Sequence, residues 1–311
     1  CTYLLDRFSL GQLYAHSIAR HIKANDIKLV HLNNWPLLND GGLMAAKKAG
    51  VPVVMHVRGL AYGSRLVSWL TKQADHVIAI SEYEKNKILG LGVDPERITV
   101  IPNAVDGERF RAEADGDAFK SDSAIPKDVR LVGIVGCLVG WKGHKVFLEA
   151  CSKVLTPGII HALIVGDTPD GNPKYMNELK GYAARLGLAD CVHFVGHRRD
   201  VASAMDACDV IVHASTEPEP FGRVVIEAMS LAKPVIATSP GGPGEIITNN
   251  VDGLLIKPDD PELLSESILL CLTNKNFSIK IGADAQKKVF EKYNVDTYVK
   301  NVKKIYNDMF K

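Results

Sequence analysis

The sequence predicts an α/β protein made of two Rossmann-like domains, and three observations support this prediction. Short β-branched runs alternate with amphipathic segments along most of the 311 residues, a pattern typical of parallel sheets whose two faces are covered by helices. The alternation stops at a polar stretch over residues 111–128 and then restarts. A chain of this length also accommodates about two domains of roughly 100–200 residues each.

The first half of the chain alternates helices with four expected strands. Apolar residues recur at helical spacing over residues 10–24, which predicts a helix. Further helices are expected at residues 40–49, 62–73 and 82–90. The expected strands are the apolar runs 28–32, 52–57, 76–81 and 98–103. A complete Rossmann-like domain would have a leading strand and glycine loop before residue 10, and the chain begins with Cys1 rather than Met. We therefore expect this domain to lack its start.

The second half alternates helices with six expected strands. These strands are the runs 131–135, 161–165, 192–195, 210–214, 234–238 and 253–256, and a final helix is expected at 296–309. We predict an N-terminal domain over residues 1–120, a C-terminal domain over residues 121–295, and a last helix, 296–311, that packs back on the first domain. Ligands of such folds bind where parallel strands end, so the two domains are expected to face a binding cleft.

The composition is that of an ordinary globular protein without a dominant charge. Apolar residues make up 46% of the chain, charged residues 23%, and the net charge is +1, so no global field attracts nucleic acid. No apolar run approaches the ~18 residues of a membrane-spanning helix, and no signal peptide is visible. The six cysteines form no C-x-x-C pair, which argues against a zinc or redox motif and favours a reducing, cytoplasmic setting.

Two carboxylates flank the expected start of a helix in the second half. Glu219 follows the strand at 210–214, and Glu227 lies eight positions later on the second turn of the helix. A helix N-terminus presents unpaired N–H groups that can hold a phosphate, and carboxylates accept hydrogen bonds from hydroxyl groups. Two carboxylates that flank such a phosphate site could hold the two sugars of a nucleotide sugar. The alternative is an acid that offsets the helix dipole together with a surface glutamate.

A glycine loop over residues 133–145 (GIVGCLVGWKGHK) follows another expected strand and leads into a helix. Glycine spacing alone is a weak indication, but Lys142 near a helix start could neutralise a leaving diphosphate. A solvated lysine at the helix start is the alternative. No Asp-x-Asp pair stands at the end of an expected strand and no other metal cluster is evident, so the expected site has no metal and needs no cofactor beyond its substrate.

The run EPFGRVVIEAM at residues 219–229, followed by KPVIAT and GGPGE, resembles the family-4 (group 1) retaining glycosyltransferases of the GT-B fold. The signature of that family is a Glu-x7-Glu pair, and Glu219 and Glu227 fall on its two positions. Other segments that match the family pattern are 75–81, 101–106 and 142–143. The resemblance covers most of the chain and is more specific in the second half. It implies a GT-B fold with two Rossmann-like domains facing a cleft, the N-terminal one incomplete.

The resemblance implies a role for each residue around the donor. Glu219 would bind hydroxyls of the donor sugar and act in catalysis together with Lys142, which would face the diphosphate. Glu227 would bind the ribose of the nucleotide. The backbone amides of Phe221 and Gly222 would contact the diphosphate or the sugar.

Five more residues complete the implied donor side. Gly242 and Glu245 would shape the same pocket. Cys137 stands where the family commonly has an arginine, which removes one charge from the phosphate site. The backbone of His197 and Arg198 would pass near the nucleotide base, and the alternative for this pair is an ordinary loop between a strand and a helix.

Three residues of the first half are candidates through the same resemblance. His56 ends an expected strand and would reach the donor sugar, although a core histidine with satisfied hydrogen bonds is the competing interpretation. Arg58 would contact an anionic acceptor. Asn34 follows the 28–32 strand and could line an acceptor groove.

The expected activity is that of a retaining hexosyltransferase. It would move a sugar from a UDP- or GDP-sugar to a hydroxyl of a carbohydrate or lipid-linked acceptor. The usual setting of the family is polysaccharide or glycolipid assembly, which allows peripheral contact with the inner membrane surface. Two alternatives stay open. One is a sugar-nucleotide-binding subunit without turnover, which Cys137 and the short first half favour. The other is a nucleotide-sugar epimerase on the same scaffold.

Overall fold

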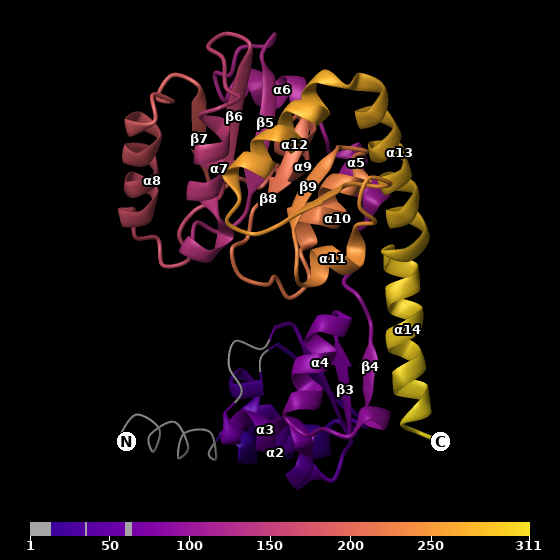
Figure 1. Cartoon of the computed structure of the whole chain (residues 1–311). Helices are drawn as coiled ribbons and strands as arrows, with labels where there is room; N and C mark the ends of the chain where they lie inside the picture. The colour runs from indigo at the N-terminus through magenta and orange to yellow at the C-terminus, as the bar shows by residue number, and fades with distance from the viewer. Residues whose placement is uncertain (1–13, 35, 60–63) are drawn as a thin grey trace. The chain divides into compact units, whose positions relative to one another are not determined.

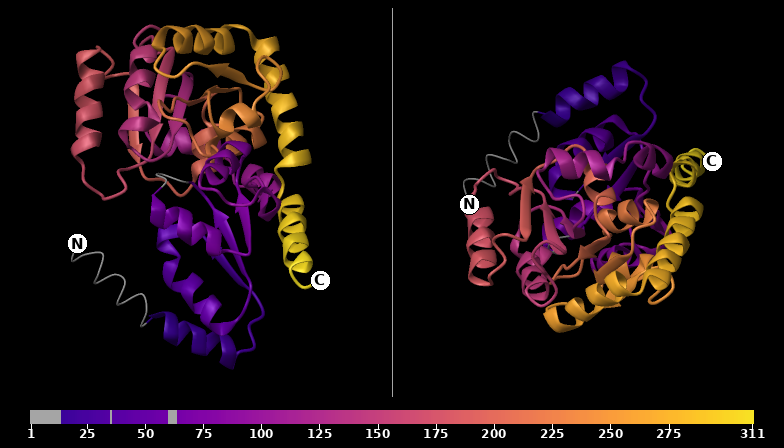
Figure 2. Two further views of the ribbon diagram at one scale, coloured as in Figure 1. Left: turned by 60° about the horizontal axis from the view of Figure 1, so that its bottom comes forward. Right: turned by 90° about the horizontal axis from the view of Figure 1, so that it is seen from above.

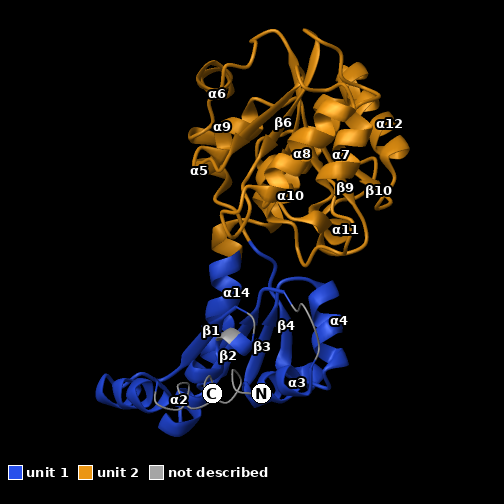
Figure 3. Cartoon of the chain, turned by 90° about the vertical axis from the view of Figure 1, so that its left-hand side faces the viewer, with its two compact units in different colours: residues 1–103, 298–311 blue, residues 104–297 orange. Residues whose placement is uncertain are grey.

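The computed structural model describes residues 14–34, 36–59 and 64–311, and helices alternate with strands along the described chain (Figure 1). The chain divides into two compact units (Figure 3). Unit 1 comprises residues 1–103 and 298–311, and unit 2 comprises residues 104–297. Each unit contains one parallel sheet, so the predicted α/β class with two parallel sheets is confirmed.

Unit 1 is built on a four-stranded parallel sheet in the order β1-β2-β3-β4. Its strands are β1 Val30–Asn33, β2 Val53–Val57, β3 His76–Ala79 and β4 Ile98–Val100. Its helices are the segment 14–24, η1 Pro36–Leu38, α2 Asp40–Ala49, α3 Arg65–Gln73, α4 Glu82–Gly90 and η2 Pro95–Arg97. Strand β2 is buried along its whole length, as expected for an inner strand of a covered parallel sheet.

Unit 2 is built on a six-stranded parallel sheet in the order β10-β9-β8-β5-β6-β7. Its strands are β5 Arg130–Val135, β6 Ile160–Val165, β7 Val192–Gly196, β8 Val210–His213, β9 Val235–Thr238 and β10 Leu254–Ile256. Its helices are α5 Gly107–Ala112, α6 Gly116–Asp122, η3 Gly140–Lys142, α7 His144–Cys151, α8 Lys174–Arg185, α9 Val201–Asp206, α10 Arg223–Ser230, α11 Gly242–Ile246, α12 Pro261–Thr273 and α13 Lys275–Lys292. The four and six strands expected from the sequence are the strands of these two sheets.

The main core of unit 2 lies under one face of its sheet. There, α7, α8 and α12 pack on the strands through a cluster of buried aliphatic and aromatic side chains. Phe147 and Leu148 of α7 and Leu179 of α8 belong to this cluster and are fully buried. Helix α10 packs against β8 and β9 and against α13. Both faces of the sheet are therefore covered, which leaves its edges and strand ends for ligands.

Residues 111–128 do not form a linker. They contain α6, which packs against α9 of unit 2. The N–H of Gly116 donates to Asp206 Oδ2 (3.1 Å) at the start of α6. The boundary predicted at residue 120 therefore falls inside unit 2, and the division lies at residues 103–104. The polar composition of this segment reflects the exposed faces of a short helix.

The chain passes between the units twice, and the segments that adjoin these crossings are tied together within each unit. In unit 1, Arg58 donates hydrogen bonds to Asn103 Oδ1 and, at 3.1 Å, to the hydroxyl of Tyr298. In unit 2, Val105 pairs with Asn294 in a parallel bridge. Arg58 thus binds both Asn103, where the chain leaves unit 1, and Tyr298, where it returns.

Helix α14, Val295–Asp308, completes the core of unit 1. Its residues Val302 and Ile305 are 8% exposed. They pack with buried side chains of the sheet and of the segment after it, namely Val54, Ile78 and Ile101. Figure 1 and the left view of Figure 2 both show this helix, in yellow, beside the strands of unit 1.

Replacing Ile305 with alanine should destabilise unit 1 by about 2–5 kcal/mol, because the change leaves a cavity under α14. Val299→Ala is the matched control, since Val299 lies on the same helix and is 38% exposed. Hydrogen exchange measures the effect separately in each sheet. We expect faster exchange in β2 and β3 of Ile305→Ala and unchanged exchange in β5 and β8. Equal exchange in the two variants would contradict the packing role of Ile305.

Candidate functional site

Apart from His197 and Arg198, which follow β7, the candidate residues of unit 2 lie on three loops at the carboxyl edge of its sheet and on the helices after them. These loops follow β5, β8 and β9, which are neighbours in the sheet. The strand order reverses between β5 and β8, because β6 and β7 continue on one side and β9 and β10 on the other. In open α/β sheets, ligands bind at this switch point outside the carboxyl ends of the strands.

The loop after β5 sits directly against the end of β8. Gly143 has a left-handed backbone with φ of +73°, and a Cβ at this position would lie 1.8 Å from the carbonyl oxygen of Ala214. Only glycine permits this approach. The N–H of Thr216 also donates to the carbonyl of Trp141 (2.8 Å). The contact carries Lys142, at the end of η3, to the residues that follow β8.

The glycine loop after β9 holds the backbone of Glu219. Glu219 pairs in parallel with Gly241, and the N–H of Gly242 donates to the carbonyl of Glu219 (2.8 Å). Gly241 has a φ of +119°, and a Cβ at Gly242 would lie 2.3 Å from the Cα of Phe221. Both positions therefore require glycine, and the predicted Gly242 serves the site through its backbone.

The side chain of Glu219 is the centre of a polar network. Its Oε2 accepts hydrogen bonds from Lys142 Nζ, from His213 Nε2 (3.3 Å) and from the hydroxyl of Ser215 (3.4 Å). The side chains of Lys142 and Glu219 are 21% and 14% exposed. Burial alone would raise the pKa of Glu219, but the hydrogen bond from His213 and the charge of Lys142 outweigh it and lower this pKa to about 2. The structure thus brings together two residues that the sequence places 77 positions apart.

The start of α10 lies in the same loop region. Its N-cap residue, Gly222, has a left-handed backbone and contributes no side-chain cap, so the first N–H groups of the helix are not capped by a side chain. The ring of Phe221 is buried and packs edge-on against Tyr293 at 6.1 Å between ring centroids. Glu227, on the second turn, accepts a hydrogen bond from Arg223 (2.7 Å), and its side chain is 13% exposed.

Arg198 is occupied by contacts away from the Glu219 network. Its guanidinium donates to both Asp200 (2.6 Å) and Asp122 (2.9 Å) and lies over the ring of Phe119 at 5.0 Å. His197 beside it is exposed. The side chain of Arg198 therefore serves packing between α6 and the loop after β7, and its backbone is the part left for a ligand.

Cys137 and Glu245 both expose their side chains on loops of this edge. Cys137 follows β5 directly after Gly136 and is an exposed free thiol. Glu245 lies on α11, the short helix that begins at Gly242. Because Cys137 carries no positive charge, Lys142 is the cation that the loop after β5 supplies to Glu219.

His56 is a core residue of unit 1 with no exposed surface. Its ring stacks on Tyr298 (6.1 Å between centroids) and lies 5.5 Å from the ring of His31. Both ring nitrogens are buried, and neither has a partner among the described residues. Burial, followed by the charges of Arg58 and His31, lowers the pKa of His56 to about 3. Because both ring nitrogens are unpaired within the described chain, His56 does not match a core histidine with satisfied hydrogen bonds, and its contact with the donor sugar stays a prediction.

Arg58 and Asn34 lie near the carboxyl edge of the unit 1 sheet. The guanidinium of Arg58 donates to Asn33 Oδ1 (2.8 Å), to Asn103 and to the hydroxyl of Tyr298, which are all neutral acceptors. Asn34 is exposed, has a φ of 142°, and donates its N–H to the carbonyl of His56 (3.1 Å). Sequence reasoning placed both residues after strands correctly, but it did not foresee the three acceptors that hold Arg58.

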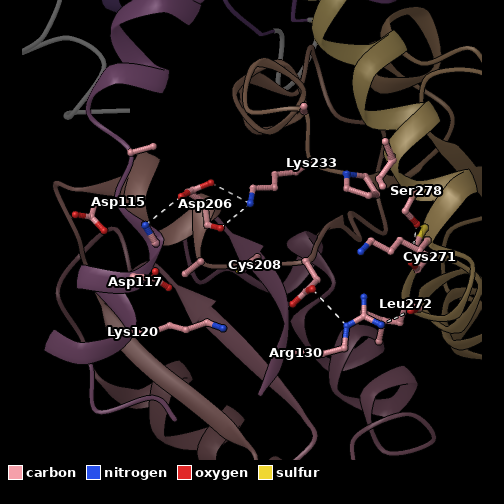
Figure 4. Close-up of a pocket in the computed structure, with 18 residues that line it drawn as sticks. Asp115, Asp117, Lys120, Arg130, Asp206, Cys208, Lys233, Cys271, Leu272 and Ser278 are labelled. Atoms are coloured by element: carbon pink, nitrogen blue, oxygen red, sulfur yellow. Dashed lines mark hydrogen bonds and ion pairs between the residues drawn. The ribbon is translucent and has the colours of Figure 1, made fainter. Parts of the chain in front are cut away.

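A hollow of 770 Å³ lies at the opposite, amino edge of the unit 2 sheet (Figure 4). Acidic and basic side chains line this hollow and form ion pairs with one another. Lys233 pairs with Asp206 (3.0 Å), and Arg130 pairs with Asp209 (3.3 Å). None of the predicted site residues lines this hollow. Its position before the strands, rather than after them, separates it from the Glu219 network.

Two members of the Glu219 network, His213 and Ser215, were not predicted as site residues. His213 ends β8, and Ser215 follows two positions later. A polar residue at the carboxyl end of a strand beside the switch point is a signal that could have identified both. The signal was hidden because the run VIVHA is otherwise apolar.

The described part of the chain contains neither a group of metal-ligating side chains nor a membrane-spanning helix. Within residues 14–34, 36–59 and 64–311, no three His, Cys, Asp or Glu side chains gather so that they could hold a metal ion. Over the same ranges, no helix combines the length and the apolar character needed to cross a membrane.

Two family models match the chain. The model described as "Glycosyl transferases group 1" matches residues 115–288, and the model described as "Glycosyltransferase Family 4" matches residues 2–109. The first of these covers more than half of the chain, so the protein belongs to the group 1 glycosyltransferases. The resemblance seen in the sequence is thereby confirmed.

Individual relatives and solved structures agree with this family. An α-1,3-galactosyltransferase of Escherichia coli is 29% identical in an alignment of 299 positions that covers 91% of this chain and 76% of that protein. A D-inositol 3-phosphate glycosyltransferase of Actinosynnema mirum is 30% identical in an alignment of 276 positions that covers 80% of this chain and 64% of that protein.

Among solved structures, a glycosyltransferase of Rickettsia africae superposes with a TM-score of 0.89 at 26% identity, covering 97% of this chain and 82% of that one. The Anabaena protein HepE in complex with UDP-glucose gives a TM-score of 0.85 at 27% identity, covering 94% and 82%. The fold class is GT-B.

Glu219 should make the stability of unit 2 depend on pH. Because its pKa is lowered to about 2, its contribution is complete above the usual carboxyl pKa near 4.5 and is lost as the pH falls toward 2. At one pKa unit per about 1.4 kcal/mol, the contribution is roughly 3 kcal/mol. The stability difference between the wild type and Glu219→Gln, measured by urea unfolding, should shrink between pH 5 and pH 3. Glu266→Gln, an exposed position on α12, is the control. A difference for Glu219→Gln that stays constant or grows as the pH falls would contradict the role of the network.

Proposed function

We propose that this chain transfers a hexose from a UDP- or GDP-sugar to a hydroxyl acceptor, with retention at the anomeric carbon and without a metal ion. The observation that carries the proposal is the contact of Lys142 with Glu219 beside the uncapped start of α10. A sugar diphosphate needs a cation, an acceptor for its hydroxyls, and N–H groups for its phosphate oxygens. All three kinds of group lie on adjoining loops of unit 2.

The donor-side roles follow from the placement of each group. Glu219 accepts hydrogen bonds from the sugar hydroxyls, and Glu227, the fifth residue of α10, accepts them from the ribose. The N–H groups of Phe221 and Gly222 and the ammonium of Lys142 bind the diphosphate. The backbone of the loop after β7 borders the base, because the guanidinium of Arg198 is already paired.

The proposed reaction needs no side chain as general base. The bond between the anomeric carbon and the diphosphate breaks as an oxocarbenium-like state forms, and the diphosphate takes the bonding electrons. The acceptor hydroxyl attacks the same face of the sugar, and a leaving phosphate oxygen takes its proton. The protein contributes positioning and electrostatic stabilisation of the leaving group, for which Lys142 supplies the charge.

The acceptor side of the proposal falls to unit 1. Arg58 is held by neutral acceptors and keeps its charge available for an anionic acceptor, and the exposed Asn34 follows Asn33, one of these acceptors. The Escherichia coli relative is named for transfer to a diphosphoundecaprenol-linked sugar, and the Actinosynnema relative for transfer to D-inositol 3-phosphate. These names support an acceptor that carries phosphate, in polysaccharide or glycolipid assembly at the inner membrane surface.

The proposal is tested by calorimetric titration of the chain with a panel of UDP- and GDP-sugars, followed by assay of nucleoside diphosphate release. We expect one nucleotide series to bind and to be turned over slowly by transfer to water or to an added acceptor. Failure of every UDP- and GDP-sugar to bind would contradict the proposal. Binding with no release under any condition would instead identify a sugar-nucleotide-binding subunit.

Glu219 and Glu227 should fail in different ways when each is replaced by alanine. Glu227→Ala should weaken binding of the bare nucleoside diphosphate by about 1.5–3 kcal/mol, as expected for a lost charged hydrogen bond. Glu219→Ala should abolish transfer while the bare nucleoside diphosphate still binds. Calorimetry with UDP or GDP and a transfer assay compare the two variants. Equal loss of nucleotide binding in both would contradict the division of roles.

A further inference from the structure

We infer that His213 is a positioning residue for Glu219, and that the two oxygens of the Glu219 carboxylate have separate tasks. Oε2 is anchored to the protein, and Oε1 is the atom that receives a hydroxyl of the donor sugar. The inference deepens the proposed function and rests on it for the identity of the ligand. The anchoring itself is a property of the protein alone.

The donors around Glu219 gather on one oxygen only. Lys142 Nζ, His213 Nε2 and the hydroxyl of Ser215 all contact Oε2. A carboxylate oxygen has two lone pairs, so three donors saturate it. In the part of the chain that the structure describes, no hydrogen bond is made to Oε1. A ligand hydroxyl therefore finds its acceptor at Oε1.

His213 is well placed to hold Oε2 because its position at the end of a buried inner strand restricts its side chain. It ends β8, an inner strand between β5 and β9, and it is 6% exposed. The hydroxyl of Thr238 in β9 donates to the carbonyl of Ser215 (2.7 Å) and lies 3.4 Å from the carbonyl of His213. The other ring nitrogen, Nδ1, is buried and has no partner among the described residues. Nε2 is thus the atom through which this ring acts, and it must carry a proton to donate to a carboxylate.

The anchor matters because Lys142 has a second task in the proposed function. When the ammonium of Lys142 turns toward a diphosphate, it no longer holds Glu219. His213 and Ser215 then keep Oε2 in place and leave Oε1 aimed at the sugar. Without His213, the carboxylate would follow Lys142 toward the diphosphate, and the geometry for the sugar would be lost. Such preorganisation is the usual basis of precise positioning in a site.

The first test compares three variants with UDP-glucose and UDP as probes. His213→Leu removes the donor at similar volume, and His213→Gln restores an N–H near the position of Nε2. His161→Leu is the control, since His161 is another buried strand histidine of the same sheet, 5% exposed and bonded to His193 at the amino edge. We expect His213→Leu to bind UDP-glucose about tenfold or more weakly, the size of a lost charged hydrogen bond. Its UDP affinity should be unchanged. His213→Gln should recover most of the loss.

A purely structural role for His213 would give a different result. UDP and UDP-glucose would then weaken together, His213→Gln would not recover, and His161→Leu would behave like His213→Leu. Any of these outcomes would overturn the inference.

The second test needs no ligand. Carbon-13 NMR of labelled glutamate side chains follows the titration of Glu219, assigned by its loss in Glu219→Gln. In the wild type the carboxylate should stay ionised to the lowest pH at which the fold survives, since its pKa is about 2. In His213→Leu the pKa of Glu219 should rise toward or above the usual carboxyl range. The burial that raises this pKa is then opposed only by the remaining partners of the carboxylate. His213→Gln should lie closer to the wild type.

The two tests separate the inference from the proposed function. If wild-type protein fails to bind any UDP- or GDP-sugar, the proposed function is contradicted, and the carboxyl titration still decides whether His213 anchors Glu219. If binding is normal but the titration of Glu219 is the same in wild type and His213→Leu, the anchoring is overturned and the proposed function stands.

Discussion

The close contact of two backbone segments makes the candidate site possible. The loop after β5 can lie against the end of β8 only because Gly143 has no Cβ to collide with the carbonyl of Ala214. That approach carries Lys142 to Glu219. The loop after β9 contacts the segment that follows β8 as well. There, Gly241 pairs with the backbone of Glu219, and the N–H of Gly242 donates to the carbonyl of Glu219. The placement of Lys142 and Glu219 therefore depends on glycines that contribute no side chain to the site.

The buried ion pair in this site is balanced by additional hydrogen bonds. Two charges removed from water repay their desolvation only when good geometry and further partners satisfy them. His213 and Ser215 provide these partners for Glu219, and the ring of Trp141 lies 4.3 Å from the ammonium of Lys142. The network thus holds two opposite charges together where both side chains are largely buried and electrostatic interactions are stronger than in water.

The sequence revealed the strands and the signature residues, but not the contacts that depend on sheet order. Buried parallel strands read as continuous apolar runs, so both sheets could be predicted. The contact of Lys142 with Glu219 could not, because it depends on β5 and β8 being neighbours. The partners of the Arg198 side chain were missed for a related reason. Its partner Asp122 lies on α6, and the polar residues of α6 resembled a linker.

The discontinuity of unit 1 sets the order in which the molecule can be completed during synthesis. Unit 2 is one continuous segment, residues 104–297, and can fold as soon as that segment has left the ribosome. Unit 1 begins earlier but waits for residues 298–311, which cover Val54 and Ile78 and bring Tyr298 to Arg58. A nascent chain therefore carries an uncovered apolar sheet through most of its translation, and this sheet is the surface that a chaperone would need to protect.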